Sequence, residues 1–549
     1  MLRSRVPTYF AAMALTALLA AGCRQAPERA GGPAGTSATP HRGGTAIIGW
    51  TAEPGGVNYL IQPNSQVSNE VIFRLFLRLA EEQPDFEKHP PTFKPELAAS
   101  WDWSPDRKTL TFHLRDGVVW SDGVPVTSED VRWTWQAQRD PAVAWDNSES
   151  KQWITDVEAV DPRTVRFHFS RVYAKQFLDA NEGSILPKHA WEKLPQAEWR
   201  HNADWFRQHL VVDGPFTISS WEPQQQIVLQ RNPRYYEPGL PRLERAVMRQ
   251  VPDASTAFTQ LLNGELDFFP QIAPADVPRA QASPRLQVVS YWTNLFVGIA
   301  WNNENPLFRD PEVRRALTLA TDRQTIVQTL LGPYGRVADS PILTTVWAHD
   351  ARLKPWPYDP NEARRILAAK GWRDSDGDGV LDKNGKPFAF ELITNAGNRI
   401  RTDATVMLQD QLKRVGIRVT PRQIEFNTLM EQTQAGKYEA CVVGYSLDTS
   451  LDLSGNFQSR SIGEGNNAMR YRNPEVDRLI ETAAAQRDVQ AEKPYLDQLQ
   501  QIIHREQPLT FLWESQRPTA INKRVRDARP NSMHSLFNLK EWWIDRPQG

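Results

Sequence analysis

Residues 95–135, PELAASWDWSPDRKTLTFHLRDGVVWSDGVPVTSEDVRWTW, predict a β-hairpin that leads into a helix. Within this stretch the apolar residues Leu110, Phe112 and Leu114 alternate with polar ones, which is the period of a half-buried strand. Clusters of Ser, Pro, Asp and Gly stand on both sides of that strand and favour turns. The spacing therefore predicts one strand face in a hydrophobic core and the other toward solvent.

A helix start follows the hairpin. Thr127 precedes Asp130 by three positions, which is the spacing of a capping box. The acidic side chain also complements the positive end of the helix dipole. We therefore expect a helix that begins directly after Thr127.

Three segments of this stretch resemble the signature of the extracellular solute-binding proteins of family 5, the peptide- and nickel-type receptors of ABC importers. They are PELAASW at 95–101, TFHLRDGVVWSDG at 111–123 and PVTSEDV at 125–131. Other segments resemble further motifs of that family and follow the family's order along the chain. These are Gly43–Gly49, Ile185–His189, Asp213–Phe216, Arg231–Tyr236, Leu262–Asp267 and Trp301–Leu317.

The resemblance implies an α/β protein with the type II periplasmic-binding-protein fold. This fold has two lobes around a cleft, and peptide receptors typically carry an additional domain. The expected lobe I is discontinuous and combines residues 43–69, 181–291 and 515–549. Residues 70–180 would form the additional domain II, and residues 292–514 would form lobe III.

Hydrophobic spacing adds three local expectations. The apolar run Val71–Leu79 predicts a helix, and Thr321 with Gln324 predicts a second capping box. An apolar stripe over residues 404–415 precedes a strand that starts at Ile417. This alternation of helix and strand indicates a mainly parallel sheet.

The first residues have the composition of a secretory signal. Basic Arg3 and Arg5 precede a short apolar run, and small residues lead to Cys23. The sequence Ala-Ala-Gly-Cys resembles a bacterial lipobox, which implies that residues 1–22 are removed and that Cys23 carries the lipid. The alternative is an ordinary signal peptide with an unmodified cysteine.

Residues 23–42 are rich in Ala, Gly, Pro and Ser and lack periodicity, which predicts a flexible tether. With the lipobox, this composition indicates an exported protein that is lipid-anchored, in the periplasm or at the outer face of the cytoplasmic membrane.

Composition and motifs argue against several classes of protein. The 64 Lys and Arg residues against 65 Asp and Glu give a net charge of −1, so no basic field favours nucleic acid. No segment after residue 25 approaches the roughly 20 apolar residues of a membrane span. The chain has no His-Glu-x-x-His, and Ser148–Lys151 matches Ser-x-x-Lys without its companion motifs. We therefore expect a protein that is not an enzyme.

An acidic run at 374–382 has two interpretations. Its Asp spacing is that of the first half of an EF-hand loop, but Gly385 stands where the bidentate Glu should be. The first interpretation, which we expect, is an Asp- and Gly-rich turn with no cofactor. The second is a structural calcium ion, held by Asp374, Asp376, Asp378, Asp382 and the carbonyl group of Val380.

The resemblance also implies ligand contacts. Peptide receptors of the family carry a Gly-Trp pair and an Asp three residues beyond the Trp, which pairs with the α-ammonium group of the peptide. Here Tyr445 replaces the Trp and Asp448 takes the acidic position. A charged amine in a closed cleft needs such a carboxylate, because its burial is otherwise uncompensated. The alternative is a solvated loop acid; the other implied contacts are Trp301, Asn302 and Glu53.

These features predict the substrate-binding component of an ABC importer, which captures oligopeptides or peptide-like solutes and delivers them to the permease by lobe closure. Its partners would be the peptide, the transmembrane subunits of the permease, and the membrane through the lipid anchor only. We expect a monomer without nucleic acid. Alternatives within the family are receptors for a nickel complex, an oligosaccharide or an opine. Alternatives from other classes are a sensory receptor that presents its ligand and an exported hydrolase.

Overall fold

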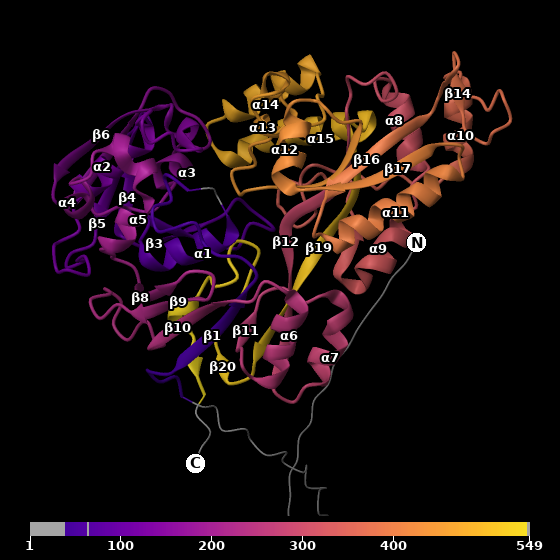
Figure 1. Ribbon diagram of the computed structural model, residues 1–549. Helices are drawn as coiled ribbons and strands as arrows, with labels where there is room; N and C mark the ends of the chain where they lie inside the picture. The colour runs from indigo at the N-terminus through magenta and orange to yellow at the C-terminus, as the bar shows by residue number, and fades with distance from the viewer. Residues whose placement is uncertain (1–38, 63–64, 546–549) are drawn as a thin grey trace, which may run out of the picture. The chain divides into compact units, whose positions relative to one another are not determined.

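The computed structural model describes residues 39–62 and 65–545, and Figure 1 shows their course. From residue 40 on, the described residues form one compact unit. The predicted signal sequence, Cys23 and most of the predicted tether lie outside the described residues. Within the described ranges, no helix combines the length and apolar character that crossing a membrane requires.

The hairpin and helix predicted from residues 95–135 are confirmed. Strand β4 (Ala98–Trp103) pairs antiparallel with β5 (Thr109–Leu114), whose three alternating apolar side chains are buried. Helix α2 (Ser128–Arg139) begins after Thr127, whose backbone N–H donates to the Asp130 carboxylate at 2.9 Å. Local periodicity and capping thus determine this segment.

Strands β4 and β5 belong to a four-stranded antiparallel sheet in the order β4-β5-β7-β6. The other two strands are β6 (Ile154–Asp161) and β7 (Thr164–Phe169). In the part of the chain that the structure describes, three short strand pairs lie outside this sheet and the large one. They are β2 (Ala80–Glu82) with β3 (Phe93–Pro95), β14 (Asp382–Lys383) with β15 (Lys386–Pro387), and β20 (Val525–Arg526) with β21 (Trp543–Ile544).

The large sheet has eleven strands in the described residues, in the order β17-β16-β18-β12-β19-β11-β1-β10-β9-β8, with β13 paired to β19. Its strands are β1 (Thr45–Trp50), β8 (Phe216–Glu222), β9 (Gln226–Arg231), β10 (Arg245–Gln250), β11 (Phe268–Phe269), β12 (Leu286–Trp301), β13 (Gly335–Val337), β16 (Ala389–Asn395), β17 (Arg418–Ile424), β18 (Ala440–Ser446) and β19 (Leu509–Asn522).

The expectation of a mainly parallel sheet is wrong, because the sheet is mixed. Strand β1 pairs parallel with β10 and β11, and β16 pairs parallel with β17 and β18. The long central strands β12 and β19 run antiparallel to each other and to their other neighbours. Helices and strands alternate along the chain from β16 to β18 and from β10 to β12, but the antiparallel strands between these regions make the sheet mixed.

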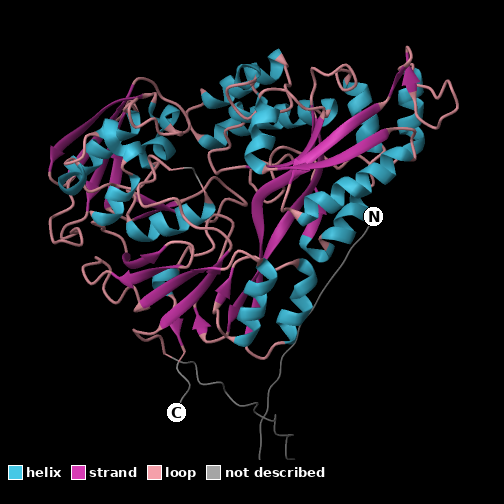
Figure 2. Ribbon diagram, viewed as in Figure 1, coloured by secondary structure: helices cyan, strands magenta, loops and turns pink. Residues whose placement is uncertain are grey.

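Strands β12 and β19 extend through the whole middle of the sheet (Figures 1 and 2). The first half of β12 pairs with the end of β19, and its second half pairs with the start of β19 and with β18. Their register shifts between Trp292 and Phe296, so that β12 bulges there. A bulge interrupts the ladder and bends the strand, so the two halves of the sheet meet between Trp292 and Phe296.

Helices pack along the large sheet and around the four-stranded sheet (Figure 2). Their bounds are α1 (Gln66–Leu75), α3 (Gln176–Asn181), α4 (Lys188–Trp191), α5 (Ala203–Gln208), α6 (Ala254–Asn263), α7 (Val277–Ala282), α8 (Pro311–Leu319), α9 (Arg323–Leu330), α10 (Pro360–Ala369), α11 (Arg399–Lys413), α12 (Phe426–Gln434), α13 (Ser454–Phe457), α14 (Pro474–Ala484) and α15 (Lys493–Glu506).

Two local predictions about helices are wrong. Helix α1 begins earlier and ends at Leu75, because Ser65 caps it and the chain then becomes extended toward Asp213, whose carboxylate accepts from the Leu77 N–H at 2.9 Å. The second capping box does not form, because Asp322 caps α9. The hydroxyl of Thr321 instead donates to the Leu317 carbonyl at 2.9 Å.

The hydrophobic cores are assembled from distant parts of the chain. One core combines Ile48, Phe112 and Leu229 with Ile521 and Trp542. The residues around β16, β17 and β18 form two other cores with the start of β19. The predicted boundaries of the lobes and of the additional domain stay a prediction.

Candidate ligand-binding site

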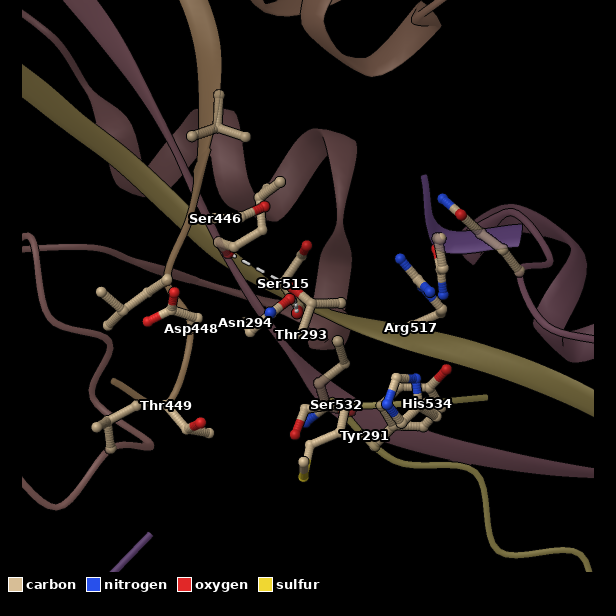
Figure 3. Close-up of a pocket in the computed structure, with 18 of the residues that line it drawn as sticks. Tyr291, Thr293, Asn294, Ser446, Asp448, Thr449, Ser515, Arg517, Ser532 and His534 are labelled. Atoms are coloured by element: carbon tan, nitrogen blue, oxygen red, sulfur yellow. Dashed lines mark hydrogen bonds between the residues drawn. The ribbon is translucent and has the colours of Figure 1, made fainter. Parts of the chain in front are cut away.

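A pocket of about 880 Å³ lies at the bulge of β12 and β19. Figure 3 shows its labelled residues, with Asp448 and Thr449 on one side and Arg517 and His534 on the other. The loop after β18, helix α1 and residues 532–534 near the C-terminus also contribute to its lining. The pocket is therefore bounded by segments from both halves of the large sheet.

The central wall of the pocket is the bulged backbone itself. The Thr293 hydroxyl donates to the Ser515 carbonyl at 3.0 Å, and the Leu447 N–H donates to the Asn294 carbonyl at 2.8 Å. These bonds join β12 to β19 and to the end of β18 where the regular ladder is interrupted. Such irregular backbone presents polar groups toward a ligand while the flanking strands stay paired.

Asp448 lines the pocket from the loop after β18 and is exposed. Its Oδ1 atom accepts from the Ser450 N–H at 3.0 Å and from the Ser450 hydroxyl at 2.5 Å. This Asx turn fixes the orientation of the carboxylate. A carboxylate held in this way offers its second oxygen to a cationic group in the pocket.

Arg517 brings a positive charge to the other side. It stands opposite Tyr291 in the β12–β19 ladder and lines the pocket. Within residues 39–62 and 65–545, its half-buried guanidinium group has neither an ion pair nor a hydrogen bond. Arg401 also lines the pocket and donates to the Asn395 side chain at 3.0 Å.

His534 contributes an uncharged ring beside Arg517. Burial lowers the pKa of His534 well below its usual value, and the nearby Arg74 and Arg78 lower it further. The imidazole is therefore neutral at physiological pH. Its ring packs edge-on against Phe73 of α1, with 4.7 Å between centroids.

Of the ligand contacts predicted from the sequence, only Asp448 lines this pocket. Asp448 lines the pocket, whereas Tyr445 is buried outside its lining and its ring stacks on Phe296 with 5.3 Å between centroids. Trp301 and Asn302 are also buried and outside the lining. The Trp301 indole N–H donates to Thr510 at 3.1 Å, and the Asn302 amide donates to the Tyr438 carbonyl at 2.9 Å.

Glu53 lies away from Asp448, at a separate small pocket. Its carboxylate accepts from the Trp221 indole N–H at 2.7 Å and from the Gln224 backbone N–H at 3.1 Å. These bonds attach the loop after β1 to β8 and to the turn that follows β8. In the described structure Glu53 therefore holds neighbouring segments together.

Three of the five predicted metal ligands come together. Carboxylate oxygens of Asp374, Asp376 and Asp378 lie within 4.8 Å of one another, and all three residues are exposed. Asp374 accepts from two backbone N–H groups of the turn, at Gly377 and Gly379. Asp378 forms an ion pair with Arg418 at 2.9 Å.

Asp382 faces a different partner, because its Oδ2 atom accepts from the Ser375 N–H at 2.9 Å and from the Ser375 hydroxyl at 2.6 Å. The turn and Arg418 thus already supply donors to the acidic side chains of this run.

Sequence reasoning missed the residues that meet at the bulge. Thr293, Ser515 and Arg517 belong to two strands far apart in the chain, and no motif marks any of them. The polar run Ser515–Arg517, within a strand whose other residues are buried, is a local feature that sequence reasoning could have singled out.

Comparison with known proteins identifies the family. Residues 92–467 match the model of the bacterial extracellular solute-binding proteins, family 5 (middle region). The chain belongs to this family. The oligopeptide-binding protein AppA of Bacillus subtilis is 31% identical over 511 residues, which cover 92% of each chain. The probable D,D-dipeptide-binding periplasmic protein DdpA of Escherichia coli is 25% identical over 510 residues, which cover 90% of this chain and 93% of DdpA.

Solved structures of family 5 show the same fold. The structure of AppA from Bacillus subtilis in complex with a nonapeptide has a TM-score of 0.80 at 30% identity. It covers 92% of this chain and 100% of AppA. NikZ of Campylobacter jejuni in complex with Ni(L-His) has a TM-score of 0.79 at 24% identity, over 91% of this chain and 99% of NikZ, and is similar in fold. The α/β, type II periplasmic-binding-protein fold with an additional domain is therefore confirmed, and the family consists of binding proteins rather than enzymes.

Proposed function

We propose that this protein captures oligopeptides or peptide-like solutes outside the cytoplasmic membrane and delivers them to the permease of an ABC importer. The observation that carries the proposal is the similarity to AppA along nearly the whole chain, because AppA binds a nonapeptide in its solved structure. The pocket at the bulge supports it, since it offers a carboxylate on one side and a free guanidinium group on the other.

Asp448 is the proposed partner of the peptide's α-ammonium group. It projects from the loop after β18, and its orientation is fixed by Ser450. An ammonium group that leaves water needs a carboxylate partner, since the burial of an unpaired charge costs several kcal/mol. Arg517 provides complementary charge for a peptide carboxylate on the opposite side.

Lobe closure would occur about the bulge of β12 and β19. The two strands link the halves of the large sheet, and the interrupted ladder between Trp292 and Phe296 is the level at which a bend disturbs the fewest hydrogen bonds. The predicted lobe boundaries would lie at this position, because the middle segment of lobe I would end at residue 291 and lobe III would span residues 292–514.

Export and anchoring complete the proposal. The signal sequence at residues 1–22, lipidation at Cys23 and a tether over residues 23–42 would hold a monomeric receptor at the membrane, beside the transmembrane subunits of the permease. The basis is the sequence of the N-terminus, together with the extracellular character of the family.

Two measurements test the proposed function. Mass spectrometry of small molecules released from the purified, denatured protein should find peptides. Calorimetry should then show binding of synthetic nonapeptides with free termini. A protein that releases a different solute and binds none of the peptides would contradict the peptide assignment and leave the family assignment intact.

A further inference from the structure

Glu82 is an acidic residue of the pocket that belongs to neither the Asp448 loop nor the central strands. It ends strand β2, which pairs with β3 outside the large sheet. Its side chain lines the same pocket as Asp448, yet the residue is only 8% exposed. Two carboxylates therefore reach the pocket from different parts of the fold, one exposed and one buried.

The Glu82 carboxylate is incompletely satisfied. Its Oε1 atom is fully covered, and no hydrogen-bond donor among the described residues reaches it. A buried acceptor without a donor costs about 1–3 kcal/mol, and more when it is charged. Such an orphaned atom in the wall of a binding pocket indicates a donor that arrives with the ligand.

The charged neighbours of Glu82 do not supply that donor. Desolvation raises the pKa of Glu82 and the charges of Glu182 and Asp448 raise it further, while a hydrogen bond from the Thr449 side chain and the charge of Arg78 lower it. Lys175, which interacts electrostatically with Asp448, forms its ion pair with Asp452 at 3.6 Å. Among the described residues neither Glu82 nor Asp448 forms an ion pair, and Arg78, which also lines the pocket, lies over the Phe73 ring at 4.9 Å.

We propose that Glu82 is a second receptor for the ligand's ammonium group and binds it opposite Asp448. The inference rests on the proposed function and names the chemistry at one end of its ligand: a free, protonated primary amine. Such a group has three N–H donors, so it can donate to both carboxylates and retain one donor for a neutral acceptor. An acetylated amine has no charge and a single N–H, and it would leave one carboxylate unpaired.

The arrangement also couples binding to closure. Glu82 comes from the β2–β3 strand pair, within the residues expected to form the additional domain, and Asp448 comes from the loop after β18. Without a cation the two carboxylates repel each other, which disfavours their approach. An ammonium group between the two carboxylates attracts both of them and so replaces their mutual repulsion with attraction. A ligand with a free amine would therefore favour the closed form, as its preferential binding to that form requires.

The test compares Glu82→Gln with Glu81→Gln, which removes a charge from the preceding residue of the same strand outside the pocket lining. Each variant is titrated by calorimetry with a synthetic nonapeptide that binds the wild type and with its N-acetylated form. We expect Glu82→Gln to weaken the free-amine peptide about ten- to hundredfold and to leave the acetylated peptide unchanged. Glu81→Gln should affect neither.

Equal losses for both peptides, or no loss for either, would overturn the inference, because Glu82 would then act only in packing or not at all. Glu82→Asp keeps the charge and shortens the side chain. It should cause a smaller loss that is again confined to the free-amine peptide, and it supplies the test if Glu82→Gln does not fold. If the wild type binds none of the nonapeptides in either form, the proposed function itself is wrong.

Discussion

The carboxylate of Glu70 on α1 accepts a hydrogen bond from the backbone N–H of Leu536 at 3.1 Å, and so attaches the C-terminal segment to the first helix. It also accepts from the Ser535 N–H at 2.5 Å and pairs with Arg74 at 3.1 Å. Both charged residues are buried. The segment that this carboxylate holds continues directly into His534 of the pocket wall.

We predict that Glu70→Ala destabilises the protein by about 3–5 kcal/mol, because it leaves the buried Arg74 guanidinium group and two backbone N–H groups without their acceptor. Urea denaturation at neutral pH measures the loss. The control is Glu87→Ala at an exposed position, which should change the free energy of unfolding by less than about 0.5 kcal/mol. Equal effects of the two substitutions would show that the buried pair contributes nothing.

The hairpin around Leu110 and the helix after Thr127 could be predicted because strand alternation and capping depend on neighbours within a few residues. The position of the site depended on pairing between distant strands. Arg517 faces Tyr291 only because β12 and β19 form one ladder, and the bulge that shapes the pocket leaves no local signal.

The same limit explains the misplaced contacts. The family resemblance led to Asp448 in the pocket wall, but it also selected Trp301 and Asn302, whose buried side chains bond to Thr510 and to the Tyr438 carbonyl. From the sequence alone, a motif whose side chains pack in the core cannot be distinguished from one whose side chains contact the ligand.

Asp448→Ala should weaken a free-amine nonapeptide by roughly a hundredfold or more, since an ammonium group inside the closed protein would lose its carboxylate partner. Acetylation of the same peptide should impose a similar loss on the wild type and little further loss on the variant. Calorimetry of all four combinations gives the coupling energy. Strict additivity of the two losses would mean that Asp448 remains in solvent and that the amine binds elsewhere.

Cys23→Ser should release the protein from membranes, because the lipid chains of the anchor contribute about 0.8 kcal/mol for each buried methylene group. Fractionation of cells into soluble and membrane parts, followed by a salt wash, measures the distribution. A Ser variant that stays in the washed membranes would contradict lipidation at this position. The Cys441→Ser variant, which changes a buried cysteine of the folded body, provides the control for effects on folding.

Removal of divalent metal should leave the melting temperature unchanged. The Asp374 and Asp378 carboxylates already accept from the turn and from Arg418, and Asp382 binds Ser375, so the segment has its own donors. Differential scanning calorimetry with EDTA, and again after addition of calcium, provides the measurement. A melting temperature that falls with EDTA and recovers with calcium would establish a structural ion instead.

Tyr445→Phe should keep peptide affinity unchanged and raise stability by up to about 1 kcal/mol. The Tyr445 hydroxyl is buried, and among the described residues it has no hydrogen-bond partner. The removal of an unsatisfied polar atom abolishes its desolvation cost, while the ring keeps its stacking on Phe296. The matched substitution is Tyr471→Phe, whose hydroxyl donates to Glu506 at 2.7 Å, and which should destabilise the protein by about 1 kcal/mol or more. Thermal unfolding of both variants measures the stability changes, and a peptide titration of Tyr445→Phe measures its affinity. A loss of affinity in Tyr445→Phe would mean that this hydroxyl takes part in ligand binding.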